Sequence, residues 1–262
     1  MEEVRTSSWD ELQQILFTDS WQPEISRFRS PYAFRGISHS PASLQTSLAR
    51  LGGDYTAMEP HLLRNFKKYA RRSIPEGEDS DWYWLSLGKH YGLPTRLLDW
   101  SFSPFVALHF ATDNIDLFDQ DSEIWMVNFH RAHELLPKKF RSMLEEEGSD
   151  VFTVKMLARA AGSIDALNNF SREAFVFFFE PPALDERITN QYALFSAMSS
   201  PTAKMEEWLE RHPEAYRKII LPAAMKWEVR DKLDQANITE RVLFPGLDGL
   251  SRWLARQYMP RK

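Results

Sequence analysis

Residues 85–112, LSLGKHYGLPTRLLDWSFSPFVALHFAT, hold the signals that decide the fold. Gly92 can adopt the left-handed conformation that ends a helix, and Pro94 cannot continue one, so a helix is expected to stop here. The next residues, 95–100, are predicted to form a short strand. A second helix should follow at once, because Pro104 is well suited to a first helical position. The stretch therefore predicts helix, turn, strand and helix in immediate succession.

Three residues of this stretch stand where a purely structural segment would carry aliphatic side chains: His90, Arg96 and Asp99. Charged groups are seldom buried without partners. Arg96 and Asp99 are expected either to form a buried ion pair that locks the strand or to serve a ligand. His90 is either a core histidine whose hydrogen bonds are satisfied or a group that takes part in chemistry. The residues alone leave both alternatives open.

A further candidate lies earlier, in the aromatic stretch PYAFRGIS at 31–38. We expect a strand here, with Arg35 at its end and Gly36 directly after it. A glycine lets a ligand approach the backbone, and a guanidinium pairs with phosphate or carboxylate. The two residues together suit an anion clamp.

Hydrophobic periodicity divides the rest of the chain into further helices and strands. Strands are predicted at 123–129, 175–180, 187–196 and 217–221. Helices are predicted at 8–16, 43–51, 59–70 and 82–90, across 131–170, at 205–212 and 224–236, and after Pro245. The run FVFFFE at 175–180 is apolar almost throughout, which is typical of a strand covered on both faces.

Composition limits the class of protein. The chain has 262 residues, of which 43% are hydrophobic and 13% aromatic, enough to bury a large core as one domain or a domain with an appendage. The net charge of -5 provides no general basic field, so a nucleic-acid partner would need a local patch. Basic clusters at 64–72 and 138–141 are most simply solvated helix faces.

Several functional classes are disfavoured. Cysteine is absent, which removes disulfides, thiolate metal sites and cysteine nucleophiles. No carboxylates cluster in a metal-ligand arrangement, so we expect no metal site and disfavour a metal-dependent nuclease. The N-terminal stretch MEEVRTSSWDEL is unlike a secretory signal, and no apolar run approaches the roughly 18 residues of a membrane span. A cytoplasmic protein without a membrane partner is therefore expected.

Several of these motifs together resemble the FRG domain family, which is named for the tripeptide that stands here as Phe34-Arg35-Gly36. The longest shared motif is HYGLPTRLLDW at 90–100. The resemblance also includes 107–111, Arg187 with Gln191 and Phe195, and LFPGLDGL at 243–250. It spans most of the chain, and the chain departs from the family pattern at Ala193, where the family usually has glycine. The resemblance implies a single FRG-type domain over 1–262, with 1–28 as an N-terminal helical extension.

The order of these residues is also similar to that of ADP-ribosyltransferases. Those enzymes build a split NAD pocket from an early-strand Arg or His, a Ser or Tyr strand leading into an Ala-rich helix, and a late-strand Glu or Gln. Here Arg35, Ser101 and Gln191 stand in that order. The similarity implies an α+β fold, with an ADP-ribosyltransferase-like split, mostly antiparallel sheet surrounded by helices.

This similarity assigns roles to the candidate residues and makes NAD the substrate. NAD would be held by Arg35, Gly36, Arg96 and Ser101. The catalytic residues would be Arg35, His90, Asp99 and Gln191. Because the amide of Gln191 cannot act as a general base, His90 or Asp99 is expected to move the proton, unless the acceptor needs little deprotonation.

The expected function is NAD-dependent ADP-ribosyl transfer to a macromolecular acceptor, whether RNA, DNA or protein, by a toxin or defence effector. An effector of this kind leaves room for a neutralising antitoxin protein as a partner. The alternative is a non-catalytic domain that binds a nucleotide or a protein partner through the same pocket.

Overall fold

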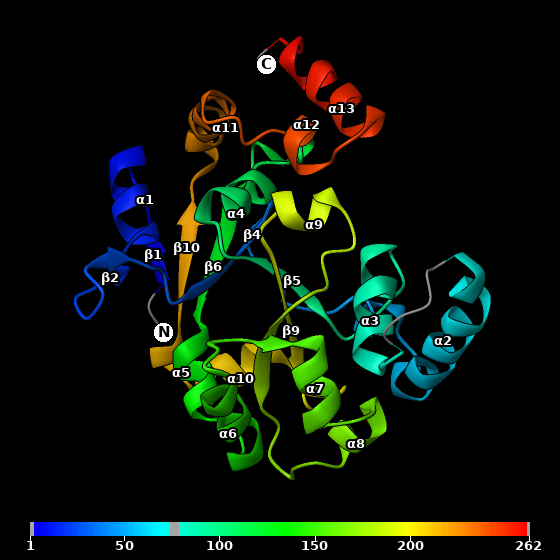
Figure 1. Ribbon diagram of the computed structural model, residues 1–262. Coiled ribbons are helices and arrows are strands. Elements are labelled where there is room, and N and C mark those ends of the chain that lie inside the picture. The colour runs from blue at the N-terminus through cyan, green and yellow to red at the C-terminus, as the bar shows by residue number, and fades with distance from the viewer. Residues whose placement is uncertain (1–2, 74–78, 261–262) are drawn as a thin grey trace.

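The computed structural model describes residues 3–73 and 79–260 (Figure 1). Its strands are β1 (Glu3–Arg5), β2 (Trp21–Gln22), β3 (Arg27–Phe28), β4 (Tyr32–Ile37), β5 (Leu98–Ser101), β6 (Ser122–Asn128), β7 (Phe152–Thr153), β8 (Val176–Glu180), β9 (Ala193–Met198) and β10 (Tyr216–Leu221). Its α-helices are α1 (Trp9–Leu16), α2 (Tyr55–Ala70), α3 (Asp81–His90), α4 (Pro104–Ala111), α5 (Phe129–Glu134), α6 (Lys138–Glu147), α7 (Val154–Ala160), α8 (Ile164–Asn168), α9 (Glu186–Asn190), α10 (Met205–Arg211), α11 (Lys226–Gln235), α12 (Glu240–Leu243) and α13 (Leu247–Gln257).

One large sheet organises these elements. Its strand order is β1-β10-β6-β4-β5-β9-β8-β7, and a small hairpin of β2 and β3 stands apart from it. Pairing is parallel between β1 and β10 and between β7 and β8, and antiparallel elsewhere in the sheet. The expected mixed α+β fold with a mostly antiparallel sheet is confirmed.

The two central strands of the sheet, β4 and β5, pair over a shorter length than their neighbours do. β4 pairs with β6 along its whole length, from Tyr32 to Ile37, and β5 pairs with β9 along its whole length. Between β4 and β5, however, the only paired residues among those described are Phe34 and Ser101. The two halves of the sheet therefore meet at one residue pair and part beyond it.

The turn after α3 forms as its sequence predicts. Gly92 has a φ of 85°, and its N–H donates to the carbonyl of Lys89, while the N–H of Leu93 donates to the carbonyl of Gly88. These two bonds form the Schellman motif, which satisfies the last carbonyls of a helix. The strand predicted at 95–100 begins only at Leu98, because the backbone of Thr95 bonds to Ser47 and Leu48 instead of to a strand.

Two predicted elements are wrong. Residues 43–51 form no α-helix, only a short 3-10 turn at Ala49–Leu51. The strand predicted at 187–196 is the helix α9 followed by β9. Asp185 caps α9 by accepting the N–H of Ile188, and Tyr192 turns the chain into β9 at a φ of 47°. The alternating apolar residues of this stretch do not separate a short helix from a strand.

The N-terminal segment and the region 131–170 are also more varied than expected. The segment predicted as a helical extension contains α1, and in addition β1, which adds an edge strand to the main sheet beside β10. Residues 131–170 form a series of short helices interrupted by β7, which pairs with β8.

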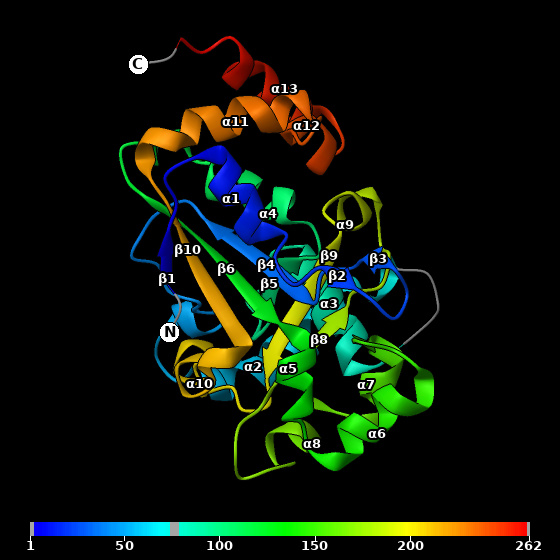
Figure 2. The ribbon, with the colours of Figure 1, turned by 90° about the vertical axis from the view of Figure 1, so that its left-hand side faces the viewer.

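The core lies on both faces of the sheet. Phe177 of β8 packs against Trp82 of α3, with ring centroids 5.6 Å apart, whereas Phe178 packs against Trp100 on the other face at the same separation. Both phenylalanines are fully buried, so β8 is covered on both sides as its apolar sequence predicts. In both ribbon views, α11, α12 and α13 lie at one end of the molecule, and α6, α7 and α8 lie at the other (Figure 1, Figure 2).

Candidate functional site

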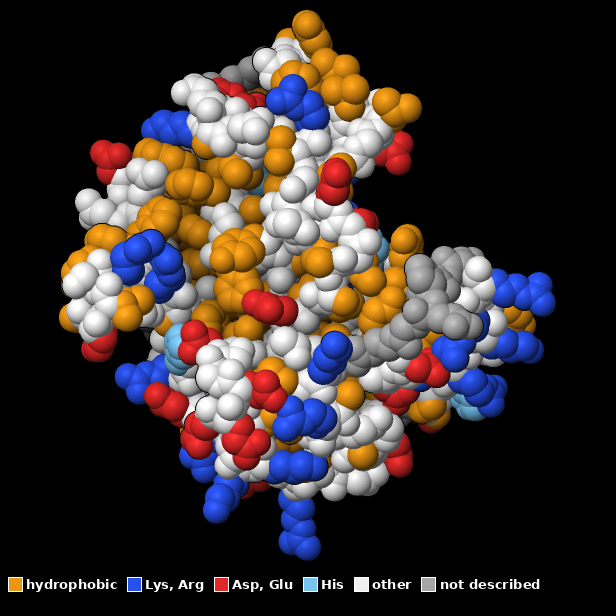
Figure 3. Space-filling model, in the orientation of Figure 1, with side chains coloured by type: hydrophobic (Ala, Val, Ile, Leu, Met, Phe, Trp, Pro, Cys, Tyr) orange, Lys and Arg blue, Asp and Glu red, His pale blue; other side chains and the backbone are white. Residues whose placement is uncertain are grey.

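A cavity of about 560 Å³ opens where β4 and β5 part. Its walls come from β4, β5 and α4, from the C-terminal end of α3 and from α9 with the residues that follow it. Figure 3 shows the surface hollowed between the regions of α9 and α3. The sequence-predicted site residues that line the cavity are Arg35, Gly36, His90, Asp99, Ser101 and Gln191; Arg96 does not line it.

Arg35 has an open hydrogen-bonding edge. Its Nη1 donates to the backbone carbonyl of Asp99 at 2.6 Å and so bridges the gap between β4 and β5. Its Nε is buried without a partner, and within the described residues its Nη2 makes no hydrogen bond either. Burial lowers the pKa of the guanidinium from its usual value. The edge formed by Nε and Nη2 is the one that can hold two oxygens of a phosphate or carboxylate at once.

Gly36 is required by the packing of α4. A Cβ at this position would lie 1.8 Å from the backbone oxygen of Ala107 and 2.7 Å from the backbone nitrogen of Ala111. The space beside Gly36 is thus filled by the helix backbone. The interpretation that this glycine makes room for a ligand is corrected: it makes room for α4, although its backbone still borders the cavity.

His90 forms a pair that the sequence did not reveal. Its Nε2 lies 2.7 Å from Oδ2 of Asp185, the capping residue of α9, and its side chain is almost buried. The pair joins the end of α3 to the residue that caps the start of α9. A carboxylate at this distance fixes the orientation of an imidazole. The only local signal for Asp185 was its position as a helix cap.

Asp99 is an accessible carboxylate between two cations. Its side chain is 56% exposed, with Oδ2 lying 2.6 Å from Nζ of Lys89 and 3.9 Å from Nη1 of Arg35. Lys89 was not among the sequence-predicted site residues, although it directly precedes His90, the first residue of the shared motif. The predicted ion pair of Asp99 with Arg96 is wrong, because Arg96 lies at a bend before β5 and pairs with Glu59 of α2 instead.

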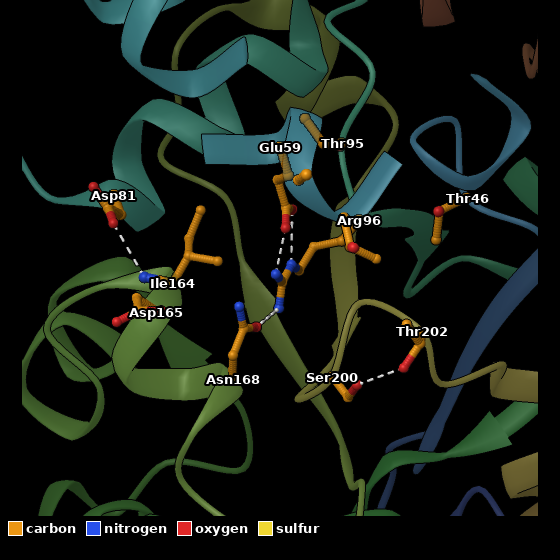
Figure 4. Close-up of polar contacts among 12 residues, drawn as sticks. Thr46, Glu59, Asp81, Thr95, Arg96, Ile164, Asp165, Asn168, Ser200 and Thr202 are labelled. Carbon is orange, nitrogen blue, oxygen red and sulfur yellow. Dashed lines mark hydrogen bonds and ion pairs between the residues drawn. The ribbon is translucent and has the colours of Figure 1, made fainter. Parts of the chain in front are cut away.

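Arg96 belongs to a separate, buried cluster (Figure 4). Its guanidinium donates to both carboxylate oxygens of Glu59 in α2, and Nη1 donates to Oδ1 of Asn168 at 2.8 Å. Arg96 and Glu59 are each about 3% exposed. These bonds join the segment just before β5 to α2 and α8, so the prediction that Arg96 holds a ligand in the cavity is replaced by a structural role.

Ser101 and Gln191 face the cavity but already have protein partners. The hydroxyl of Ser101 donates to the backbone carbonyl of Gln191 at 2.8 Å and accepts the N–H of Ser103. The side-chain amide nitrogen of Gln191 donates to the carbonyl of Leu243 at 2.9 Å. Gln191 therefore holds α12 to α9, and its Oε1 and the second hydrogen of its amide nitrogen remain for a ligand. It ends α9 instead of lying on a late strand as expected.

Arg187 adds positive charge to the same wall. It lines the cavity from α9, and its guanidinium lies 4.9 Å from the ring centroid of Phe244. Phe244 belongs to the motif at 243–250, which therefore supports the cavity wall from behind. With Arg35, Lys89 and Arg187 against Asp99 and the more distant Asp185, the lining favours an anionic ligand.

Residues 3–73 and 79–260 contain neither a metal-binding cluster nor a membrane-spanning helix. No group of three or more His, Cys, Asp or Glu side chains could hold a metal ion. No helix in this part of the chain is long and apolar enough to cross a bilayer.

Residues 30–120 match the protein-family model of the FRG domain. The match begins just before β4 and ends after α4, and it includes Arg35, His90 and Asp99 of the cavity. The resemblance to the FRG domain is therefore shown for residues 30–120, while Gln191 and the motif at 243–250 lie beyond the match. No match to the chain was found among curated proteins or among solved structures.

Proposed function

We propose that this chain is an NAD-dependent ADP-ribosyltransferase that modifies a macromolecule. The observation that carries the proposal is the buried Nε of Arg35, which has no hydrogen-bond partner, at the point where β4 and β5 part. A buried guanidinium whose Nε has no partner strongly prefers an anion with two oxygens that accept its two parallel N–H bonds. The pyrophosphate of NAD is such a group, and the parting of β4 and β5 supports the split NAD pocket that the resemblance to ADP-ribosyltransferases implies.

The size and charge of the cavity support a dinucleotide. Its volume of about 560 Å³ falls within the range of about 300–1,000 Å³ that is common for small-molecule sites. Arg35 and Arg187 both line the cavity, one from β4 and one from α9. Their charges would hold the two phosphates, while the ribose next to nicotinamide would lie toward Asp99 and His90.

The reaction breaks the bond between C1′ of this ribose and the nicotinamide nitrogen, and nicotinamide leaves with the bonding electrons. The acceptor atom then bonds to C1′, and its proton must pass to a base. The ribose is positively charged in the oxocarbenium-like transition state. In this proposal Asp99 stabilises that charge, and His90, oriented by Asp185, takes the proton. The free Oε1 of Gln191 would accept a hydrogen bond from a ribose hydroxyl.

The second candidate is a domain that binds a nucleotide without catalysis. It is favoured by the partners of Ser101 and Gln191, whose hydroxyl and amide nitrogen are bonded to the backbone. Groups committed in this way hold the cavity in shape and contribute less to a transition state. Binding of NAD without its consumption would support this candidate.

The test uses NAD labelled in its adenylate half, with nicotinamide release and label transfer to a cell extract as separate readouts. Treating the extract with ribonuclease, deoxyribonuclease or protease identifies the acceptor class. Arg35→Ala should lower activity well over tenfold, because loss of a buried charged contact costs about 2–5 kcal/mol. The fold should survive, since only one hydrogen bond across the sheet, worth about 0.5–1.5 kcal/mol, is removed.

Arg217→Ala is the matched control. Arg217 lies on β10 of the same sheet and its side chain is 26% exposed, against 21% for Arg35, but it does not line the cavity. It should retain wild-type activity. If wild-type protein neither releases nicotinamide nor transfers label, the transferase proposal fails.

A further inference from the structure

The solvent face of α2 and the turn after it is basic. Between residues 60 and 73 the chain contains no acidic residue. The exposed side chains of this segment are His61, Arg64, Asn65, Lys68, Tyr69, Arg71 and Arg72. Blue side chains accordingly gather at the edge of the molecule over α2 (Figure 3). A positive stripe of this kind is unexpected in a chain whose net charge is -5.

Ion pairing leaves part of the stripe unneutralised. Lys67 pairs with Asp81 at 2.6 Å, and Arg71 pairs with Asp79. Arg64 and Lys68 form no ion pair within residues 3–73 and 79–260. A helix face that serves only to be solvated usually mixes both signs, as α11 does where Lys232 pairs with Glu228 one turn away.

A groove runs beside these cations. Its volume is about 610 Å³, and α2 lines it with Arg64, Lys67 and Lys68. Three carboxylates also line it, and two of these, Asp79 and Asp81, are those paired with Arg71 and Lys67; the third is Asp165 of α8. An extended chain carrying a phosphate on each unit could follow such a groove and bond to successive cations.

An exposed aromatic ring stands next to the cations. Tyr69 is 74% exposed, and Nζ of Lys68 lies 5.3 Å from its ring centroid. A ring this accessible contributes little to the core. Rings interleaved with cations are the arrangement on which single-stranded nucleic acids stack their bases while their phosphates are neutralised.

We propose that this face of α2 binds single-stranded nucleic acid. The backbone would lie along Arg64 and Lys68, and an unpaired base would stack on Tyr69. α2 joins the cavity region through α3, because Lys67 of α2 pairs with the first residue of α3 and the last residues of α3, Lys89 and His90, line the cavity. A strand bound along α2 could therefore reach the cavity, which would make nucleic acid the acceptor; this second part rests on the proposed function.

Binding is measured by fluorescence anisotropy of a labelled 20-nucleotide RNA or DNA of mixed sequence, without NAD, over a series of salt concentrations. The double variant Arg64→Glu/Lys68→Glu should bind more than tenfold more weakly. Its plot of log K against log salt should also be shallower by about 1.4, since two phosphate contacts are lost and each contributes about 0.7 for a single strand.

Tyr69 provides an independent readout. Tyr69→Ala should weaken binding by about tenfold without changing the salt dependence, because stacking releases no counterions. Tyr69→Phe should bind like the wild type. These two variants separate stacking from a general attraction between charges.

The matched control is Lys138→Glu/Arg141→Glu, which makes the same change of charge on the exposed surface of α6. It should bind nucleic acid like the wild type. Equal weakening by this control, unaltered binding by the α2 variant, or a preference for duplex over single strands would overturn the proposal. If the protein binds nucleic acid but does not consume NAD, only the transferase function is refuted. If it labels protein in the presence of NAD but does not bind nucleic acid, only the role of α2 is refuted.

Discussion

Replacing Gly36 with alanine tests whether this glycine serves the packing of α4 or the approach of a ligand. The added Cβ would lie 1.8 Å from the backbone oxygen of Ala107 and 2.7 Å from the backbone nitrogen of Ala111. Because both neighbours are backbone atoms, no side-chain rotation relieves the overlap. α4 must retreat from β4 by more than about 1 Å.

A retreat of this size loosens the contacts of α4 with the sheet, where Ala107, Leu108 and Ala111 are all buried. Overpacking of a core costs about 1–3 kcal/mol, and we expect about 3 kcal/mol here because the clash is with backbone on both sides. In a chain of this length that loss lowers the melting temperature by about 6–12 °C. Thermal unfolding followed by circular dichroism, together with urea unfolding, measures both quantities.

Gly162→Ala is the control for the general effect of replacing glycine. A Cβ at Gly162 would meet its nearest neighbour, the backbone oxygen of Ala158, at 3.6 Å, which is an ordinary contact. Its stability should change by less than about 1 kcal/mol. A Gly36→Ala protein that unfolds like the wild type but no longer binds NAD would refute the packing argument and restore the ligand-approach interpretation.

Three further predictions follow from the contacts of individual side chains. Arg96→Met should lower the free energy of unfolding by about 3–5 kcal/mol, because it leaves the carboxylate of Glu59 buried without its cation. Asp99→Asn should change the free energy of unfolding by less than about 0.5 kcal/mol, because its side chain is exposed. Equal losses of stability in urea would contradict these partners. Burial lowers the pKa of His133 to about 3. Below pH 6.5 the imidazole is therefore protonated in the unfolded state and stays neutral in the native state. Stability should therefore be unaffected by this group above pH 6.5 and should fall by about 2 kcal/mol between pH 6.5 and 5, a loss that His133→Gln should reduce. In the transferase assay, His90→Ala should lower the rate by about 100-fold or more, and Asp185→Asn, which preserves the helix cap, should lower it less; full activity of both variants would exclude the pair from proton transfer.

The sequence by itself determined the elements whose signals are local. The end of α3 was predicted from Gly92 and Pro94, and the start of α4 from Pro104, because caps and turns depend on residues only a few positions apart. The buried position of β8 was predicted from its continuous apolar run. Of the seven predicted site residues, all except Arg96 line the cavity, since motifs shared with a family mark positions irrespective of distance along the chain.

The tertiary structure alone decided which groups pair. Arg96 and Asp99 are close in the sequence, yet one pairs with Glu59 of α2 and the other with Lys89 of α3, because Arg96 lies at a bend before β5 and Asp99 lies on β5. Asp185 meets His90 only once α9 is folded against α3. Hydrogen-bond partners of this kind depend on how helices pack on the sheet, and no local pattern records that packing.

The meaning of Gly36 was settled in the same way. Its sequence neighbours fit a ligand clamp, but the position of its missing side chain is taken by the backbone of α4, a helix about 70 residues later in the chain. The parting of β4 and β5 likewise arises from the pairing of each strand with its other neighbour. The local sequence indicates that a small or charged residue is needed at a position. Only the assembled fold decides which backbone or side chain that residue contacts.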